Sequence, residues 1–218
     1  MIKTHSAVHQ SLLEDYSQKK LEIKGRLAEF KKRGESSNKE IFEELAFCIL
    51  TANASAKMGL RSIEAIKPVL YNGSSEDISQ HIKGKHRFWR VRPKFIFETR
   101  EYLKEEFSFN LKEILKSSKD REDLRDFFAA NKRIKGIGYK EASHFLRNIG
   151  YSGYAILDKH ILNCLREFGV INGEKKPANK PSYLEIEKKM RHFAEEIDID
   201  MDELDLLLWS RQTGEILK

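Results

Sequence analysis

One lysine and one aspartate of this sequence stand where an amine and a carboxylate can do chemistry together. Lys140 comes directly after a short turn that contains Gly136 and Gly138, and Asp158 follows later, at the end of an apolar run. A neutral amine can attack an electrophilic carbon and form a Schiff base, and a carboxylate can stabilise the positive charge that grows on such a substrate. Each residue alone also has a simpler explanation, with Lys140 as a phosphate ligand and Asp158 as a helix cap.

The elements that must position this pair are predicted to be a helical hairpin over about 124–149 and a loop at about 150–158. Apolar residues recur at helical spacing on both sides of the turn, and those of the second helix are Ala142, Phe145, Leu146 and Ile149. Asp158 ends the loop and precedes a predicted helix at 159–168, which makes it a good N-cap candidate. The hairpin is therefore expected to present Lys140, and the loop to present Asp158.

The turn of the hairpin is suited to binding an anion. Gly136 and Gly138 allow backbone conformations that are closed to other residues, and the first N–H groups of the following helix lack partners within that helix. Lys132, Arg133 and Lys135 crowd the same turn. We predict that Gly136, Gly138 and Lys135 bind a DNA phosphate, although a Gly-x-Gly corner also occurs in ordinary helix pairs.

The rest of the sequence predicts an all-α fold. Prolines number only four, and no convincing period-two alternation of apolar residues appears. Ser37 or Asn38 is predicted to cap the second helix, and Pro93 fits the first turn of a later one. The other predicted helices are at 8–32, 56–70, 111–117, 120–131, 182–196 and 200–212, with a short helix capped by residues 74–77 and a loop at 169–181.

Composition favours a globular protein with an anionic partner. Of the 218 residues 40% are hydrophobic, and 40 Lys and Arg against 34 Asp and Glu give a formal net charge of +6 and a pI of about 9.1. A basic balance favours nucleic acid, although a basic protein without such a partner has the same composition. No signal peptide opens the chain and no apolar run approaches the ~20 residues of a membrane span, so a soluble intracellular protein is expected.

The two cysteines argue against a metal cluster. Cys48 and Cys164 both lie among apolar residues and are predicted to fill the core. Two thiols cannot form a four-thiolate iron–sulfur cluster or a structural zinc site. We therefore expect that the protein requires neither cofactor.

Two segments together resemble a signature of DNA repair enzymes. Residues 134–140 read Ile-Lys-Gly-Ile-Gly-Tyr-Lys, and residues 153–158 read Gly-Tyr-Ala-Ile-Leu-Asp. They resemble the helix-hairpin-helix and Gly/Pro-Asp motifs of base-excision DNA glycosylases, and nearly the whole chain resembles the compact 8-oxoguanine DNA glycosylase/AP lyase (type 2) family of archaea and some bacteria. The resemblance implies a single all-α domain over 1–218, with two helical subdomains and the active-site cleft between them.

The resemblance also implies roles for individual residues. It makes Lys140 the nucleophile and Asp158 the catalytic carboxylate of an enzyme that excises 8-oxoguanine from double-stranded DNA through a Lys Schiff base and β-elimination. It makes Trp209 the first candidate to stack on the damaged base and Phe95 the second, although both can also be core aromatics. It further implies that the terminal carboxylate of Lys218 accepts hydrogen bonds from the guanine edge.

The cofactor and partner expectations follow from the same resemblance. In this family the hairpin holds a monovalent cation, Na⁺ or K⁺, on backbone carbonyls, which by position are those of Lys132, Ile134 and Ile137. Some relatives carry an iron–sulfur cluster near the C-terminus, and the two cysteines of this chain are too few to hold one. We expect a monomer that binds double-stranded DNA and no membrane, in the cytoplasm at the nucleoid.

A basic and aromatic stretch at 83–94 has no assigned role in that chemistry. It is either a solvated charged face or a surface that follows the DNA phosphate backbone. Trp89, within this stretch, is predicted to be a core aromatic. His144, His160 and His192 are predicted to be structural, and His160 alone is a candidate for testing because it is close to Asp158 in the sequence.

Three other functions stay open on the sequence alone. They are a non-catalytic helix-hairpin-helix DNA-binding module, a glycosylase/lyase for oxidised pyrimidines, and an all-α interaction protein that does not bind DNA. A module keeps the hairpin and the charge without the chemistry of Lys140 and Asp158, so a covalent borohydride trap distinguishes it from an enzyme. The damaged base that supports trapping distinguishes the two enzymes.

Overall fold

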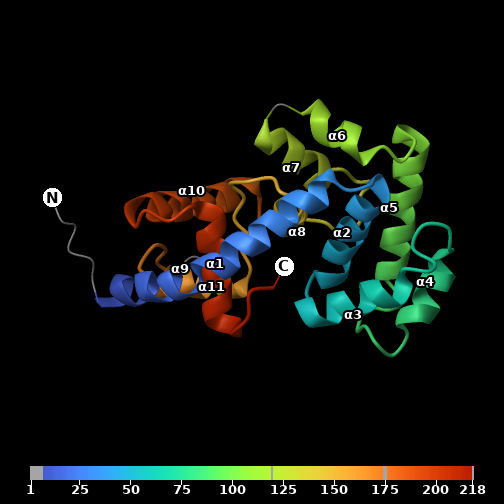
Figure 1. Ribbon diagram of the computed structural model, residues 1–218. Coiled ribbons are helices and arrows are strands. Elements are labelled where there is room, and N and C mark those ends of the chain that lie inside the picture. The colour runs from blue at the N-terminus through green and yellow to red at the C-terminus, as the bar shows by residue number, and fades with distance from the viewer. Residues whose placement is uncertain (1–6, 119, 174–175, 218) are drawn as a thin grey trace. The chain divides into compact units, whose positions relative to one another are not determined.

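The chain is all-helical over the residues that the structure describes. The computed structural model describes residues 7–118, 120–173 and 176–217, and in these ranges it has eleven α-helices and no strand, which confirms the predicted fold class (Figure 1). The helices are α1 (Ala7–Glu35), α2 (Asn38–Thr51), α3 (Ala56–Ile66), α4 (Ser75–Ile82), α5 (Arg92–Phe107), α6 (Leu111–Ser117), α7 (Arg121–Ala129), α8 (Tyr139–Asn148), α9 (Lys159–Glu167), α10 (Lys180–Glu196) and α11 (Met201–Thr213). Within these ranges no helix is both long and apolar enough to cross a membrane.

The helices fall into two compact units. The terminal unit contains Met1–Lys31 and Gly150–Lys218, and the central unit contains Lys32–Ile149. The hairpin that carries Lys140 belongs to the central unit, and Asp158 belongs to the terminal unit.

Helix α2 is the core of the central unit. It contacts α3, α5, α6 and α8, and its residues from Leu45 to Thr51 are all buried, including the reduced thiol of Cys48. α7 and α8 form the predicted hairpin, where the rings of Phe128 and Phe145 meet edge to face with centroids 4.8 Å apart. Burying these apolar side chains stabilises the pair of helices that presents Lys140.

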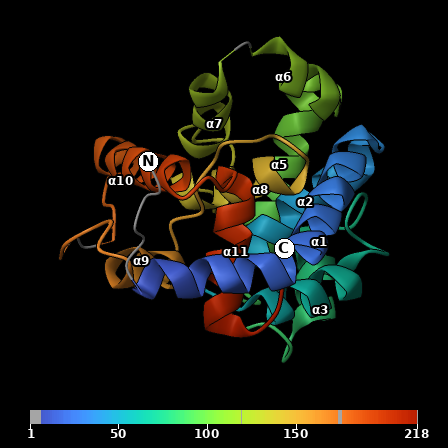
Figure 2. The ribbon, with the colours of Figure 1, turned by 60° about the vertical axis from the view of Figure 1, so that its left-hand side comes forward.

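Helix α11 is the core of the terminal unit. It packs on α9 and α10, and all its residues from Met201 to Leu208 are buried, three carboxylates among them. α1 lies across α11 (Figures 1 and 2), where the Tyr16 hydroxyl donates a hydrogen bond to Glu203 Oε2 at 2.5 Å. Burial and this bond raise the pKa of Tyr16 above its ordinary value. Cys164, the second reduced thiol, is also buried, which confirms that both cysteines fill the core.

Several predicted helix boundaries need correction. The third helix ends at Ile66 rather than near residue 70, because Pro68 has no N–H to continue the ladder. α10 begins at Lys180, where Asn179 caps it and Pro181 lies in the first turn, so the predicted loop is shorter. The predicted helix at 120–131 ends earlier, at Ala129.

Candidate active site

The turn between α7 and α8 requires a glycine at position 136. Its φ is +74°, in the left-handed region that side chains rarely adopt. A Cβ added there would lie 2.7 Å from Phe95 Cδ2 and 2.8 Å from Arg92 Nη1. The Lys135 N–H donates to Thr99 Oγ1 at 3.0 Å. The first turns of α5 therefore pack directly on the hairpin turn, and only hydrogen fits between them.

Lys140 is bound by the residue that follows it. Lys140 Nζ lies 3.1 Å from Glu141 Oε1, and these two side chains are 21% and 14% exposed. The other oxygen of the same carboxylate, Glu141 Oε2, accepts the Gly138 N–H at 3.2 Å. One carboxylate thus holds both the amine and the backbone of the turn. Sequence reasoning missed Glu141, although a glutamate three residues after an N-cap is a readable signal.

The first turn of α8 is also tied to α7. Arg125 is buried, its guanidinium lies 5.7 Å from the centre of the Tyr139 ring, and its Nη1 donates to Ser143 Oγ at 3.3 Å. The Tyr139 hydroxyl donates to the carboxylate of Asp126. These contacts between neighbouring helices keep the base of the Lys140 side chain in one orientation.

Asp158 is the N-cap of α9, as predicted. Its Oδ1 accepts the N–H groups of His160 at 2.8 Å and Ile161 at 2.9 Å. Its other oxygen, Oδ2, accepts no hydrogen bond from the described part of the chain. The side chain is half-buried. The cap therefore occupies one carboxylate oxygen and leaves the other for a substrate.

Side chains, rather than a neighbouring strand, bind the backbone of the segment that leads to Asp158. Three carboxylates accept its N–H groups at 2.9 Å, namely Asp202 from Gly153, Glu187 from Ala155 and Asp205 from Ile156. None of the three is more than 6% exposed. Charge-assisted bonds of this kind offset the cost of burying a carboxylate and rigidify the segment. We call Glu187, Asp202 and Asp205 the carboxylate cluster.

The carboxylate cluster yields a stability prediction with a control on the same helix. Glu187→Ala leaves the buried Ala155 N–H without its acceptor, so we expect the free energy of unfolding to fall by about 2–3 kcal/mol. Glu185→Ala removes a side chain that is 68% exposed and pairs only with Lys189 in the described chain, so we expect a change below about 0.5 kcal/mol. Urea denaturation of both variants checks the difference. Equal losses would show that the cluster does not hold the segment.

Trp209 and His160 lie together in the terminal unit. Their ring centroids are 6.4 Å apart in an edge-on arrangement, and the His160 N–H binds the Asp158 carboxylate. Trp209 is only half-buried, although its neighbours Leu208 and Ser210 on α11 are buried. His160 therefore links the predicted stacking residue, through its ring, to the predicted carboxylate, through its backbone N–H.

Of the two predicted aromatic residues of the central unit, Trp89 does not lie where it was predicted. Phe95 is half-buried against Gly136, with the Arg92 guanidinium 5.5 Å from its ring centre. Trp89 is not a core aromatic, because it is half-buried with the Arg90 guanidinium 4.1 Å from its ring centre. Exposed cations on both sides of Trp89 in the sequence keep this ring at the surface.

Of the predicted cation-binding carbonyls and the predicted base-binding residue Lys218, the structure describes only the carbonyls. The carbonyls of Lys132, Ile134 and Ile137 accept no hydrogen bond from the described residues. Lys218 lies outside the described residues. Among those that are described, no group of three His, Cys, Asp or Glu side chains is placed to hold a metal ion.

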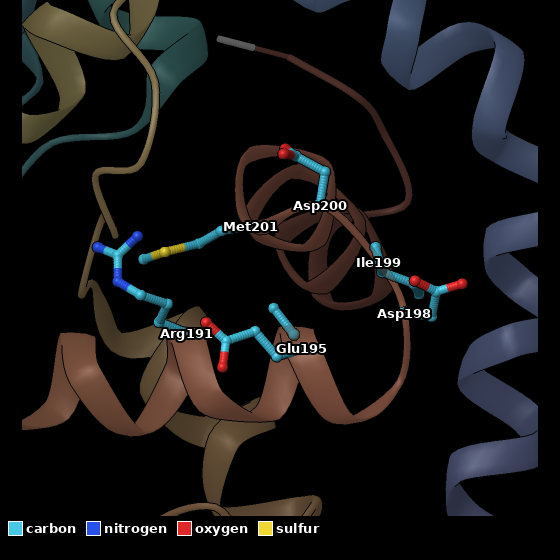
Figure 3. Close-up of a pocket in the computed structure, with 7 residues that line it drawn as sticks. Arg191, Glu195, Asp198, Ile199, Asp200 and Met201 are labelled. Carbon is cyan, nitrogen blue, oxygen red and sulfur yellow. The ribbon is translucent and has the colours of Figure 1, made fainter.

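A pocket in the terminal unit lies away from these residues. It has a volume of about 350 Å³, and Arg191, Glu195, Asp198, Asp200 and Met201 are among its lining residues, at the junction of α10 and α11 (Figure 3). No predicted site residue lines it. This pocket is therefore separate from the predicted site residues at the hairpin and at the start of α9.

Comparisons with known proteins agree with these features. A family model described as 8-oxoguanine DNA glycosylase matches residues 23–199. The chain is similar to the 8-oxoguanine DNA glycosylase/AP lyases of Methanocaldococcus jannaschii, at 42% identity over 90% of this chain and 91% of the relative, and of Korarchaeum cryptofilum, at 39% identity over 90% of both.

Solved structures give the same result. The M. jannaschii 8-oxoguanine glycosylase/lyase in complex with a 15mer DNA containing 8-oxoguanine has a TM-score of 0.85 and 39% identity, over 95% of this chain and 100% of that one. The 8-oxoguanine DNA glycosylase of Thermotoga maritima has a TM-score of 0.86 and 35% identity, over 96% of this chain and 98% of that one.

Proposed function

The chain belongs to the 8-oxoguanine DNA glycosylase family, and on this basis we propose that Lys140 and Asp158 carry its reaction. The protein is an 8-oxoguanine DNA glycosylase/AP lyase, which excises 8-oxoguanine from DNA and then cleaves the strand at the abasic site. The observation that carries this function is the match over nearly the full length to a relative crystallised with 8-oxoguanine DNA. The match covers both compact units, so we regard residues 1–218 as one catalytic domain.

In this mechanism Lys140 is the covalent nucleophile. Its neutral amine attacks the sugar carbon C1′, a C1′–N bond forms, and the bond from C1′ to the damaged base breaks. The departing base takes the bonding electron pair and a proton released by the amine. Opening of the sugar gives a Schiff base, and loss of a C2′ proton then breaks the bond between C3′ and its phosphate oxygen.

Asp158 acts on the same sugar through its charge. As the bond to the base stretches, positive charge grows on the sugar, and a fixed carboxylate stabilises that charge. The support for this role is the geometry of the cap, since Oδ1 is occupied by two N–H groups and Oδ2 accepts none in the described chain. The carboxylate cluster holds the segment before Asp158 and so limits how far the charge can move.

The damaged base must leave the duplex before it can react. An enzyme of this kind rotates the nucleotide out of the stack and binds the base between aromatic side chains. We propose that Trp209 is the first stacking residue and Phe95 the second, because both rings are half-buried. Gly136, Gly138 and Lys135 are proposed to bind a phosphate at the start of α8, where the first N–H groups of a helix favour an anion. The Gly138 N–H is donated to Glu141 and the Lys135 N–H to Thr99, so these two residues would act through other groups or after those bonds break.

A monovalent cation is proposed at the same hairpin. The carbonyls of Lys132, Ile134 and Ile137 fit such a group, because they are oxygen ligands that no donor of the described chain occupies. Bound there, a Na⁺ or K⁺ ion would add positive charge that favours a nearby phosphate. As a DNA repair enzyme the protein is proposed to act in the cytoplasm at the nucleoid, as a monomer.

A panel of duplexes tests this function. We expect excision and strand cleavage with a duplex that contains 8-oxoguanine, and little with one that contains thymine glycol. Heating samples with and without base treatment separates excision from lyase cleavage, because abasic sites break only after treatment unless the lyase has acted. Cleavage confined to thymine glycol, or binding without cleavage of any duplex, would contradict the proposal.

A further inference from the structure

Exposed cations crowd the connection between α4 and α5. No Asp or Glu occurs between Asp77 and Glu98, and this stretch contains six Lys and Arg residues. We call residues 83–91 the basic loop. Four of its cations are exposed, namely Lys83, Lys85, Arg87 and Arg90. The loop therefore presents a dense positive charge to solvent.

This charge is not neutralised by the central unit itself. Over the described residues, no carboxylate lies within 4.0 Å of the charged groups of Lys83, Lys85, Arg87 or Arg90. The nearest cation along the chain that has such a partner is Lys94, which lies 3.8 Å from Glu98. Charged residues on a merely solvated face of a helical protein are commonly interspersed with opposite charges, and here they are not.

Two of these cations lie near the indole ring of Trp89. Arg90 lies 4.1 Å and Lys83 5.5 Å from the centre of the Trp89 ring. The face of an aromatic ring attracts each cation, but the two like charges repel each other when no anion is present. A phosphodiester between or beside them would remove that repulsion. The same half-buried ring offers a flat apolar surface next to the charges.

The basic loop is anchored to the end of α2. His86 is buried, its Nδ1 accepts the Phe88 N–H at 3.0 Å, and its Nε2 donates to the Leu50 carbonyl at 2.8 Å. Burial lowers the pKa of His86, which agrees with a neutral ring in this role. The Trp89 carbonyl accepts a hydrogen bond from Ser79 Oγ at 3.0 Å. Hydrogen bonds to α2 and α4 therefore hold the backbone that carries these cations.

The loop leads directly to the hairpin. Arg92, the residue after the loop, donates to the Ala52 carbonyl at 3.0 Å and lies against the position where a Gly136 Cβ would be. Phe95 touches the same position. The basic loop and the turn between α7 and α8, which is proposed to bind a phosphate, are thus connected through the start of α5, within one unit.

From these observations we propose that the basic loop is a second DNA contact, which binds the phosphodiester backbone outside the site of Lys140. This inference rests on the proposed function, since it takes DNA as the partner. The loop adds affinity without reading the damaged base, because lysine and arginine contacts to phosphates are independent of sequence. It therefore acts equally on damaged and undamaged duplex.

The salt dependence of binding tests this surface. The triple variant Lys83→Ala, Lys85→Ala, Arg90→Ala is titrated with an undamaged duplex at several salt concentrations. We expect the slope of log Kd against log salt to become shallower by about 2 to 3, because each lost phosphate contact removes about 0.9. At low salt Kd should rise by about tenfold or more. The single-turnover rate of 8-oxoguanine excision at saturating enzyme should not change.

A matched triple variant controls for net charge. Lys104→Ala, Lys116→Ala, Arg121→Ala removes three exposed cations from the same unit, on α5 to α7. Lys104 is near the end of α5 opposite the basic loop, about 18 Å along the helix axis from Arg92. At 0.1 M salt charges this far apart are largely screened, so we expect a slope within about 1 of the parent value. Equal slopes for the two triple variants would overturn the proposal.

Fluorescence gives a readout that does not depend on removing charges. The chain has two tryptophans, so Trp209→Phe leaves Trp89 as the only emitter. We expect undamaged duplex to change the Trp89 emission, with a salt dependence that follows binding. Emission that stays constant while the duplex binds would contradict the contact. Failure of the parent protein to excise 8-oxoguanine would instead contradict the proposed function, and the binding result would stand by itself.

Discussion

Replacing Lys140 by glutamine should abolish the covalent chemistry and leave the fold intact. We expect no borohydride-trapped adduct with an 8-oxoguanine duplex, and excision slowed by at least about 10³-fold, because loss of a covalent nucleophile removes a large part of a rate enhancement. The free energy of unfolding should change by less than about 1 kcal/mol, since a partly exposed ion pair with Glu141 contributes little. Single-turnover excision, trapping and urea denaturation measure the three quantities.

The control for Lys140 is another lysine of the central unit. Lys104→Gln removes an exposed amine that pairs with Glu101 on the surface of α5. This variant should trap and excise like the parent protein. Full excision by Lys140→Gln would show that a different group attacks the sugar.

Replacing Asp158 by asparagine should separate the helix cap from the charge. Asparagine caps helices about as well as aspartate, so its amide oxygen can accept the N–H groups of His160 and Ile161 and keep α9 in place. The other oxygen becomes a neutral amino group that cannot stabilise a cation. We expect excision to fall by about 10²- to 10³-fold, the scale of losing one electrostatic stabiliser of a transition state.

A second aspartate N-cap provides the comparison. Asp120 caps α7 through the Glu122 N–H at 2.9 Å and is exposed. Asp120→Asn should leave both stability and excision unchanged. If Asp158→Asn also excised at the parent rate, Asp158 would be a structural cap and nothing more.

Local signals in the sequence predicted the positions of most elements. Ser37, Ser74 and Asp158 each cap the helix that was predicted to follow them, because the side chain and the N–H groups it binds are only two or three residues apart. Pro68 was an equally local signal that was overlooked, and its missing N–H ends α3 early.

The surroundings of the candidate site could not be predicted in the same way. The carboxylate cluster joins residues 32 to 49 positions apart, and charged residues on a helix normally indicate a solvated face. Asp202 and Asp205 are buried on α11, where the N–H groups of the segment before Asp158 donate to them. Trp89 shows the reverse case, since its apolar ring is held at the surface by its cationic neighbours.

The central claim is that the amine of Lys140 bonds to the deoxyribose of the damaged nucleotide. Borohydride reduction during the reaction with an 8-oxoguanine duplex, followed by digestion and mass mapping of the modified peptide, tests it directly. We predict a single adduct on Lys140, absent from Lys140→Gln and much reduced in Asp158→Asn. An adduct on another amine, or efficient 8-oxoguanine excision by a parent protein that forms no adduct, would contradict the account.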